Sequence, residues 1–203
     1  MKNAGVDIFS SGNHLWDRKE SLEYIKKETC IAKPLNYPKA AFGFESVRFV
    51  HDNEEIILFT LCGQAFMSPV DSPFFALEKF LDTINDLNKI IIVDFHAEST
   101  AEKKTFAYYF DGRVTAILGT HTHVQTADER ILSGGTAYIT DLGMTGITDS
   151  VIGMDPKICV ERARKQIFFR MKPLEENDSK AEVHGIIAEI NANTGKTESI
   201  RRI

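Results

Sequence analysis

Residues 90–96 have the sequence IIIVDFH, in which four aliphatic residues are followed by an acid, an aromatic ring and a histidine. A short, wholly apolar run of this kind is typical of a strand that is buried on both faces of a parallel sheet. Ser99 and Glu102 then form a capping-box pattern, which predicts a helix through about Phe110. A strand followed at once by a helix is the repeating unit of α/β proteins, so we predict an α/β fold with the strand 90–95 inside its sheet.

Two more strand-like runs end in polar segments that contain histidine. Val6 to Ser10 precedes Gly12-Asn13-His14, and Val114 to Leu118 precedes Gly119-Thr120-His121-Thr122-His123. The carboxyl ends of parallel strands meet at one edge of a sheet, and ligands of α/β proteins bind there. We therefore expect these two segments to meet His96 at that edge. Imidazole groups suit Zn, Fe and related ions, so the pattern predicts a metal site.

Periodicity and turn residues predict the remaining elements. Pro73 to Leu87 has the apolar spacing of an amphipathic helix. Asp17 is a candidate N-cap for a helix to about Lys27, and Asp155-Pro156 begins a helix to about Gln166. The mixture of helices and hairpins predicts two packed, mixed β-sheets flanked by helices. The predicted hairpins pair residues 44–50 with 55–61, 130–132 with 136–140, and 182–191 with 196–202.

Length and composition fit one soluble domain spanning residues 1–203. The net charge of −5 gives no reason to expect strong nucleic-acid binding. The longest aliphatic run, residues 90–93, is far below the roughly 20 residues of a membrane helix, so we expect no membrane association. Three cysteines without a C-x-x-C pair indicate a reduced, cytoplasmic protein. A homo-oligomer is left open.

Each candidate residue also has a simpler interpretation when it is taken alone. Asn13 suits a turn, and a histidine that ends a strand, such as His96, often makes a structural hydrogen bond. In an extended segment His121 and His123 would point to the same side, where they could bind one metal or two. His14 is placed to donate a proton to a leaving group, because imidazole titrates near neutral pH. The combination of these residues at strand ends favours the functional interpretation.

Four longer motifs make the pattern specific: GNHLWD at 12–17, VDFHAE at 93–98 with Glu102-Lys103 after it, GTHTHVQTADE at 119–129, and GTAYITDLGMTG at 135–146. Together they resemble the YmdB-like family of bacterial metallophosphoesterases, in the calcineurin-like superfamily. The resemblance covers nearly all of the chain. It implies a calcineurin-like sandwich, a dinuclear site for Fe or Mn with Zn or Mg as alternatives, and hydrolysis of small phosphodiesters. The implied substrates are 2′,3′-cyclic and 3′,5′-cyclic nucleotides.

The resemblance also implies roles for single residues. Asn13, His96 and His121 correspond to ligands of one metal, His123 to a ligand of the other, and His14 to the general acid. Family members also have a metal-binding Asp on a first strand and a later Glu that bridges the metals. No residue before Asn13 matches either, so the resemblance implies a domain that lacks its first strand-helix unit. Carboxylates that could hold the far nitrogen of a bound histidine, or equally cap loops, are Asp94, Asp128 and Asp141.

The sequence therefore leaves three functions open. The first is a metal-dependent phosphodiesterase, a hydrolase. The second is a catalytically deficient fragment that binds metal or phosphate in a non-catalytic role. The third is a mononuclear hydrolase that uses Asn13, His96 and His121 and keeps one coordination position open. Metal stoichiometry would separate the three.

Overall fold

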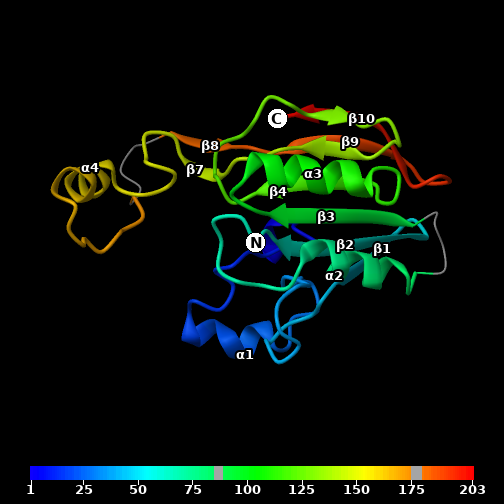
Figure 1. The fold of residues 1–203 in the computed structure, drawn as a ribbon, viewed down its shortest axis with the longest axis horizontal. Helices are drawn as coiled ribbons and strands as arrows, with labels where there is room; N and C mark the ends of the chain where they lie inside the picture. The colour runs from blue at the N-terminus through cyan, green and yellow to red at the C-terminus, as the bar shows by residue number, and fades with distance from the viewer. Residues whose placement is uncertain (85–88, 175–179) are drawn as a thin grey trace.

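A six-stranded sheet forms the centre of the computed structural model, which describes residues 1–84, 89–174 and 180–203 (Figure 1). The strand order is β1-β2-β3-β4-β6-β5. Strands β2, β3, β4 and β6 are parallel, and β1 and β5 pair antiparallel at the two edges, so the predicted α/β class is confirmed. The strand bounds are β1 Val47–His51, β2 Glu54–Cys62, β3 Ile90–His96, β4 Ala116–Thr120, β5 Arg130–Ile131 and β6 Ala137–Ile139.

Two helices, α2 (Pro73–Leu81) and α3 (Thr100–Phe110), cover one face of this sheet (Figure 1). Leu77 of α2 and Phe106 of α3 are fully buried in the core that they share with the strands. The ring of Phe106 stacks on Phe95 of β3, with a centroid distance of 4.1 Å. Burial of each such side chain stabilises the fold by roughly 1.5–3 kcal/mol, so the helices are held mainly through this face.

The opposite face of the sheet packs against the N-terminal part of the chain. Leu58 of β2 joins a second core cluster with Ala32 and Val47, and Ile8 and Ile92 pack against it. Alternate residues of a strand point to opposite faces, so β2 contributes to both clusters. The central strands are therefore buried on both sides, as the run at 90–96 predicts.

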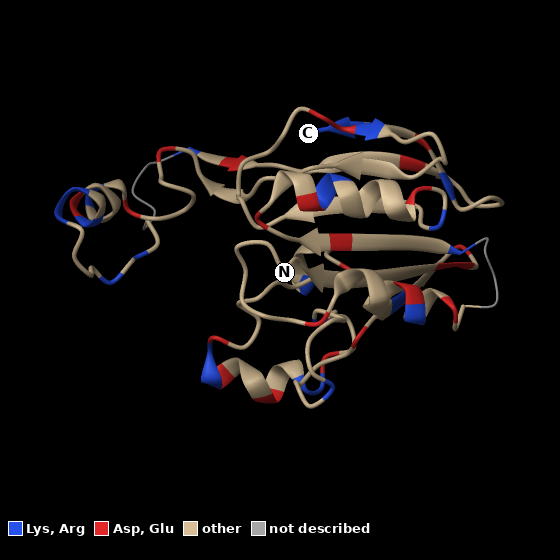
Figure 2. Ribbon diagram, in the orientation of Figure 1, with Lys and Arg blue, Asp and Glu red and all other residues tan. Residues whose placement is uncertain are grey.

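Two small sheets and a helix complete the described structure. Strand β7 (Thr145–Ile147) pairs with β8 (Ala181–Val183), and β9 (Ile186–Asn191) pairs with β10 (Lys196–Arg202). Helix α4 (Pro156–Lys165) projects away from the main sheet, and its last turn carries basic residues (Figure 2). The structure thus has one large sheet and two small ones where two packed sheets are predicted. Within the described parts of the chain, every helix is too short or too polar to cross a bilayer.

The N-terminal part differs most from the prediction. The strand predicted at residues 6–10 is reduced to a single bridge between Phe9 and Ile31. The helix predicted from Asp17 is also shorter, with a 3-10 turn at Lys19–Ser21 and α1 at Leu22–Ile25. Asp17 does not cap it, because its carboxylate lies 2.7 Å from Nδ1 of His14. A polar contact with a neighbouring residue has replaced the predicted cap.

The other predicted elements are present with changed bounds. The helix predicted at 73–87 ends at Leu81, and residues 85–87 lie outside the described residues. The strand predicted at 114–118 is shifted to Ala116–Thr120. The segment 182–191 is divided between β8 and β9, whereas the hairpins β1–β2, β5–β6 and β9–β10 and the N-caps Ser99 and Asp155 are confirmed.

A buried ion pair joins α3 to the segment after β6. Nζ of Lys103 lies 2.9 Å from Oδ2 of Asp141, and neither side chain is more than 1% exposed. Lys103 also donates to the carbonyl oxygen of Thr120, at the end of β4. The Asp141 carboxylate accepts further hydrogen bonds from Thr122 and from the N–H of Gly143. A buried pair with this many partners is stable as a unit, but either charge alone is strongly unfavourable there.

Replacement of Lys103 by methionine should reduce the free energy of unfolding by about 3–5 kcal/mol, because it leaves a buried carboxylate without its cation. The matched control is Lys104→Met, since the Lys104 side chain is 43% exposed and lies 3.8 Å from Asp128. A surface pair of this kind contributes at most about 1 kcal/mol. Urea denaturation of both variants measures the difference, and equal effects would contradict the assigned role of Lys103.

Gly119 of β4 should not tolerate a side chain. A Cβ atom at this position would lie 1.7 Å from the backbone carbonyl oxygen of Thr140, which cannot move without distortion of β6 and its following segment. We expect Gly119→Ala to destabilise the protein by about 3 kcal/mol or more, through forced backbone displacement. Gly146→Ala is the control, because the nearest atom to its Cβ would be Cε of Met144 at 3.6 Å. Thermal unfolding of the two variants tests this, and similar midpoints would refute it.

Candidate functional site

Asn13, His96 and His121 meet at the carboxyl-terminal edge of the main sheet. Oδ1 of Asn13 lies 2.9 Å from Nε2 of His96, and Nδ1 of His121 lies 3.1 Å from that same nitrogen. His96 ends β3, and His121 follows the last residue of β4. The strand-end positions correctly predicted the approach of His96 and His121, and Asn13 joins them although only a single bridge at Phe9 precedes it. What they bind remains a prediction.

The register of the sheet and one glycine explain why these residues can approach. His96 on β3 lies directly beside Thr120 on β4, which carries the chain into His121. Gly12 packs against the imidazole of His96, since a Cβ at Gly12 would lie only 2.3 Å from Cε1 of that ring. The absence of a side chain at Gly12 therefore lets Asn13 reach the ring.

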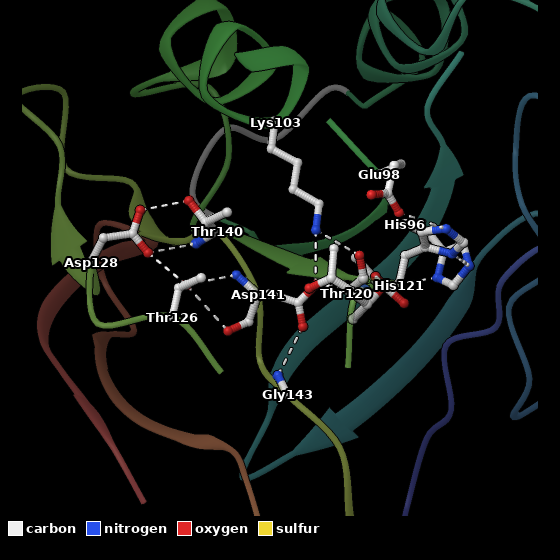
Figure 3. Close-up of polar contacts among 12 residues, drawn as sticks. His96, Glu98, Lys103, Thr120, His121, Thr126, Asp128, Thr140, Asp141 and Gly143 are labelled. Carbon is white, nitrogen blue, oxygen red and sulfur yellow. Dashed lines mark hydrogen bonds and ion pairs between the residues drawn. The ribbon is translucent and has the colours of Figure 1, made fainter. Parts of the chain in front are cut away.

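The residues behind His96 fix the position of its proton (Figure 3). The Thr120 hydroxyl donates to Oδ1 of Asp94 at 2.6 Å, and the same hydroxyl oxygen lies 3.0 Å from Nδ1 of His96. Burial raises the pKa of Asp94 to about 6, although hydrogen bonds from Thr120 and Ser10 oppose this. Since Thr120 gives its proton to Asp94, it accepts the Nδ1–H of His96.

His96 is consequently a neutral imidazole with a free lone pair on Nε2. The pKa of His96 is lowered to about 4, mainly by burial and to a smaller extent by nearby His121 and Lys103. With the proton on Nδ1, the lone pair of Nε2 points toward Asn13 and His121.

His121 is oriented in a comparable way from the other side. Its Nε2 lies 3.3 Å from Oε2 of Glu98, which favours a proton on that nitrogen (Figure 3). Burial lowers the pKa of His121, so the ring is also neutral at neutral pH and Nδ1 carries the lone pair. Three acceptor atoms therefore face one another: the amide oxygen of Asn13 and one nitrogen of each histidine. A cation between them would relieve their mutual repulsion.

His14 and His123 lie beside this cluster, and their polar contacts go elsewhere. Nδ1 of His14 pairs with Asp17, and the His14 side chain is 75% exposed. Nδ1 of His123 lies 3.1 Å from the carbonyl oxygen of Ile152, so the ring is held through that atom. Charges on His14 and His123 would nevertheless be close enough to lower the pKa of His121.

The extended conformation assumed for His121 and His123 is wrong. Both have left-handed backbones, with φ of 99° and 65°, so the rule that alternate residues face the same way does not apply. Non-glycine residues in this region cost of order 1–3 kcal/mol each and persist where the surroundings enforce them. Asp141 supplies that support, because its carboxylate accepts from both the N–H and the hydroxyl of Thr122, between the two histidines.

The three acids proposed to orient ligands have different roles in the structure. Asp94 acts on His96 through Thr120, and Asp141 holds the backbone of the histidine loop. Asp128 instead accepts hydrogen bonds from Thr126 and Thr140, and it has no contact with a histidine among the described residues (Figure 3). Asp128 is therefore a loop-capping residue.

Sequence reasoning missed several residues that shape the site. Thr120 becomes visible only once the register of β3 and β4 is known. Lys103 belongs to one of the motifs, but its burial was not predicted, because a lysine on a helix is normally solvent-exposed. Glu102 completes only half of the predicted capping box, since its carboxylate accepts from the N–H groups of Gln64 and Ala65. It holds the loop after β2 at the same edge of the sheet.

The donor set at the cluster is two imidazoles and an amide. Within residues 1–84, 89–174 and 180–203, no group of three or more His, Cys, Asp or Glu side chains is placed to hold a metal ion. Nitrogen and oxygen donors of the kind present at Asn13, His96 and His121 fit a first-row divalent ion. The carboxylates of Asp94 and Glu98 stand behind these donors, as is common for residues that orient metal-bound histidines.

Comparisons with known proteins show the family of the chain. The chain is 38% identical over 201 residues to the 2′,3′-cyclic-nucleotide 2′-phosphodiesterase of Bacillus subtilis (strain 168), covering 98% of this chain and 75% of that protein. A solved structure of a hypothetical protein from Thermus thermophilus matches with a TM-score of 0.92 and 36% identity, over 100% of this chain and 77% of that one. A novel phosphatase from Mycoplasma pneumoniae matches with a TM-score of 0.91 and 34% identity, over 100% and 73%. The model of the YmdB-like protein family matches residues 1–203, and the chain belongs to that family.

Proposed function

We propose that this chain is a metal-dependent phosphodiesterase that hydrolyses cyclic nucleotides, with 2′,3′-cyclic and 3′,5′-cyclic forms as substrates. The observation that carries the proposal is the convergence of Asn13, His96 and His121 on one point. The reaction class and the 2′,3′-cyclic substrate follow the printed name of the Bacillus subtilis relative. A calcineurin-like arrangement with two metals, acting in the cytoplasm, is part of the same proposal.

The residues that would hold metal follow from their free donor atoms. Asn13, His96 and His121 would bind one ion through the atoms that face one another. His123 would bind a second ion through Nε2, because its Nδ1 is engaged by the Ile152 carbonyl. Fe or Mn is the expected metal, with Zn or Mg as alternatives. A bound divalent ion would polarise a phosphoryl oxygen and lower the pKa of a coordinated water.

His14 would act as the general acid. Asp17 holds the imidazole of His14 through Nδ1, and the exposed ring can therefore present Nε2 to a bound substrate. His14 follows Asn13 directly, so a phosphodiester bound at Asn13 would have its leaving oxygen within reach of this ring. Protonation of that oxygen by His14 as the P–O bond breaks would prevent release of a basic alkoxide.

One observation favours a mononuclear centre as the second candidate. The three converging side chains do not include His123, whose ring is turned to the Ile152 carbonyl. A hydrolase with one ion, three protein donors and an open position would use only Asn13, His96 and His121. Elemental analysis separates the candidates, because the proposed enzyme binds two equivalents per chain and the mononuclear one binds a single equivalent.

His14→Ala should lower kcat by roughly 10²–10⁴-fold and leave the metal content unchanged, because it removes a proton donor and no metal ligand. The defect should shrink for a 4-nitrophenyl ester, whose leaving group needs little protonation. Steady-state kinetics on alkyl and nitrophenyl esters, with elemental analysis of the same samples, provide the measurement.

His51→Ala is the matched control for this variant. His51 is also exposed and lies 3.5 Å from an acid, Asp52, but it belongs to the β1–β2 turn at the opposite edge of the sheet. Its kinetics should equal those of the unmodified protein. If His14→Ala lost metal as fully as His121→Ala, His14 would be a ligand and the assignment as acid would fall.

Thr120→Val should weaken metal binding by roughly 10–100-fold, as loss of a residue that orients a metal-bound histidine typically does. Valine has the shape of threonine but cannot accept the Nδ1–H of His96. Thr120→Ser keeps the hydroxyl and should bind metal normally, which separates the hydrogen bond from the packing. Competition with a metal-sensitive dye gives the affinities. Equal affinities for the two variants would show that Thr120 does not orient His96.

A further inference from the structure

A cavity of about 420 Å³ opens beside the candidate site, and His123 forms part of its wall. Small-molecule sites are typically roughly 300–1,000 Å³ and lined mainly by apolar side chains with few polar groups. Here the apolar side chains of the described wall, which we call the methionine pocket, are Met144, Ile147, Ile152, Met154 and Leu174.

The wall of the methionine pocket is held in a fixed shape. The ring of His123 is anchored through Nδ1 to the carbonyl oxygen of Ile152 at 3.1 Å. Both partners of this contact have left-handed backbones, with φ of 65° at His123 and 47° at Ile152. A β-branched residue such as Ile152 rarely adopts this conformation, and it persists only where the surrounding structure enforces it. This contact therefore fixes the positions of His123 and Ile152, which both line the cavity, relative to each other.

The charge of the wall determines which part of a ligand could enter. Among the described residues that line the cavity, none is Lys, Arg, Asp or Glu. The described wall offers a phosphate no counter-charge, whereas an uncharged ring would replace water against apolar side chains. Methionine thioethers make favourable contacts with aromatic rings, and two of them line this cavity. Gly146 and Gly153 leave further space for a flat group.

The position of the cavity connects it to the cluster. His123 lines the cavity and is only two residues from His121 along the chain. We propose that the methionine pocket binds the nucleobase of a nucleotide whose phosphate lies at Asn13, His96 and His121. This inference rests on the proposed function and deepens it, since it assigns the base to a site separate from the phosphate.

A larger cavity of about 570 Å³ provides a contrast. It lies between α2 and residues 35–45, and its described lining includes Lys39 and Asp71 but no residue of the histidine cluster. Phe75 on its rim is 73% exposed, so its truncation disturbs little of the core. Phe75→Ala is therefore a suitable control for a change in an apolar cavity remote from the site.

The first test compares a substrate that has a base with one that lacks it. Met144→Ala and Met154→Ala should each raise KM for adenosine 2′,3′-cyclic phosphate by roughly 5–20-fold and leave kcat within about twofold. For methyl ribofuranoside 2′,3′-cyclic phosphate, which has no base, both variants should have the KM and kcat of the unmodified protein. Phe75→Ala should leave the KM for both substrates unchanged. Equal KM increases for both substrates would overturn the base site.

The second test does not depend on turnover. Protein carrying ¹³C-methyl methionine is titrated with adenosine 3′-monophosphate and, separately, with ribose 5-phosphate. The adenosine compound should shift the methyl signals of Met144 and Met154, while the signal of Met1, which is 84% exposed, stays in place. If adenosine 3′-monophosphate shifts these signals but no cyclic nucleotide is hydrolysed, the proposed function is wrong and the base-binding role of the methionine pocket stands. If cyclic nucleotides are hydrolysed and the signals do not shift, the base-binding role is wrong and the proposed function stands.

Discussion

The ion pair between Lys103 and Asp141 is the interaction on which the site depends most. It lies fully buried where α3, the end of β4 and the segment after β6 meet. Through Asp141 it also holds Thr122, and therefore the unusual backbone on either side of it. A loop with two left-handed histidines would relax toward ordinary conformations if it were not enforced. The buried ion pair thus fixes the backbone next to His121 relative to the sheet.

A second constraint is that each histidine of the site uses one nitrogen to contact the protein. His96 is held through Thr120, His121 faces Glu98, and His123 contacts the carbonyl of Ile152. The other nitrogen of His96 lies 2.9 Å from the amide oxygen of Asn13 and 3.1 Å from Nδ1 of His121. Three nitrogen and oxygen atoms of the kind that bind metals thus converge on one point. This convergence is the physical reason to interpret the cluster as a binding site.

The sequence predicts those features that depend on local pattern. The apolar run 90–96, the cap at Ser99 and the meeting of His96 and His121 at one edge follow from periodicity and parallel-strand geometry. Asn13 also lies there, although the strand predicted before it is absent. Features that depend on the pairing of strands cannot be predicted from the sequence alone. The segment 6–10 has strand-like residues but gains only one bridge, at Phe9. The contact of Thr120 with His96 requires the register of two strands, and nothing in the residue types marks His121 or His123 as left-handed.

His123 occupies a boundary between two environments, and this explains how one loop could recognise both halves of a nucleotide. On one side are neutral nitrogen and oxygen donors that attract a cation and, through it, a phosphate. On the other side is an apolar wall without charged side chains among its described residues. A nucleotide has the same two parts, a charged phosphate ester and a weakly polar base. The contact of His123 with Ile152 fixes the separation of the two environments, because the backbone on both sides of that contact is itself constrained. Specificity for a nucleotide would then arise from the distance that this contact sets between the two environments.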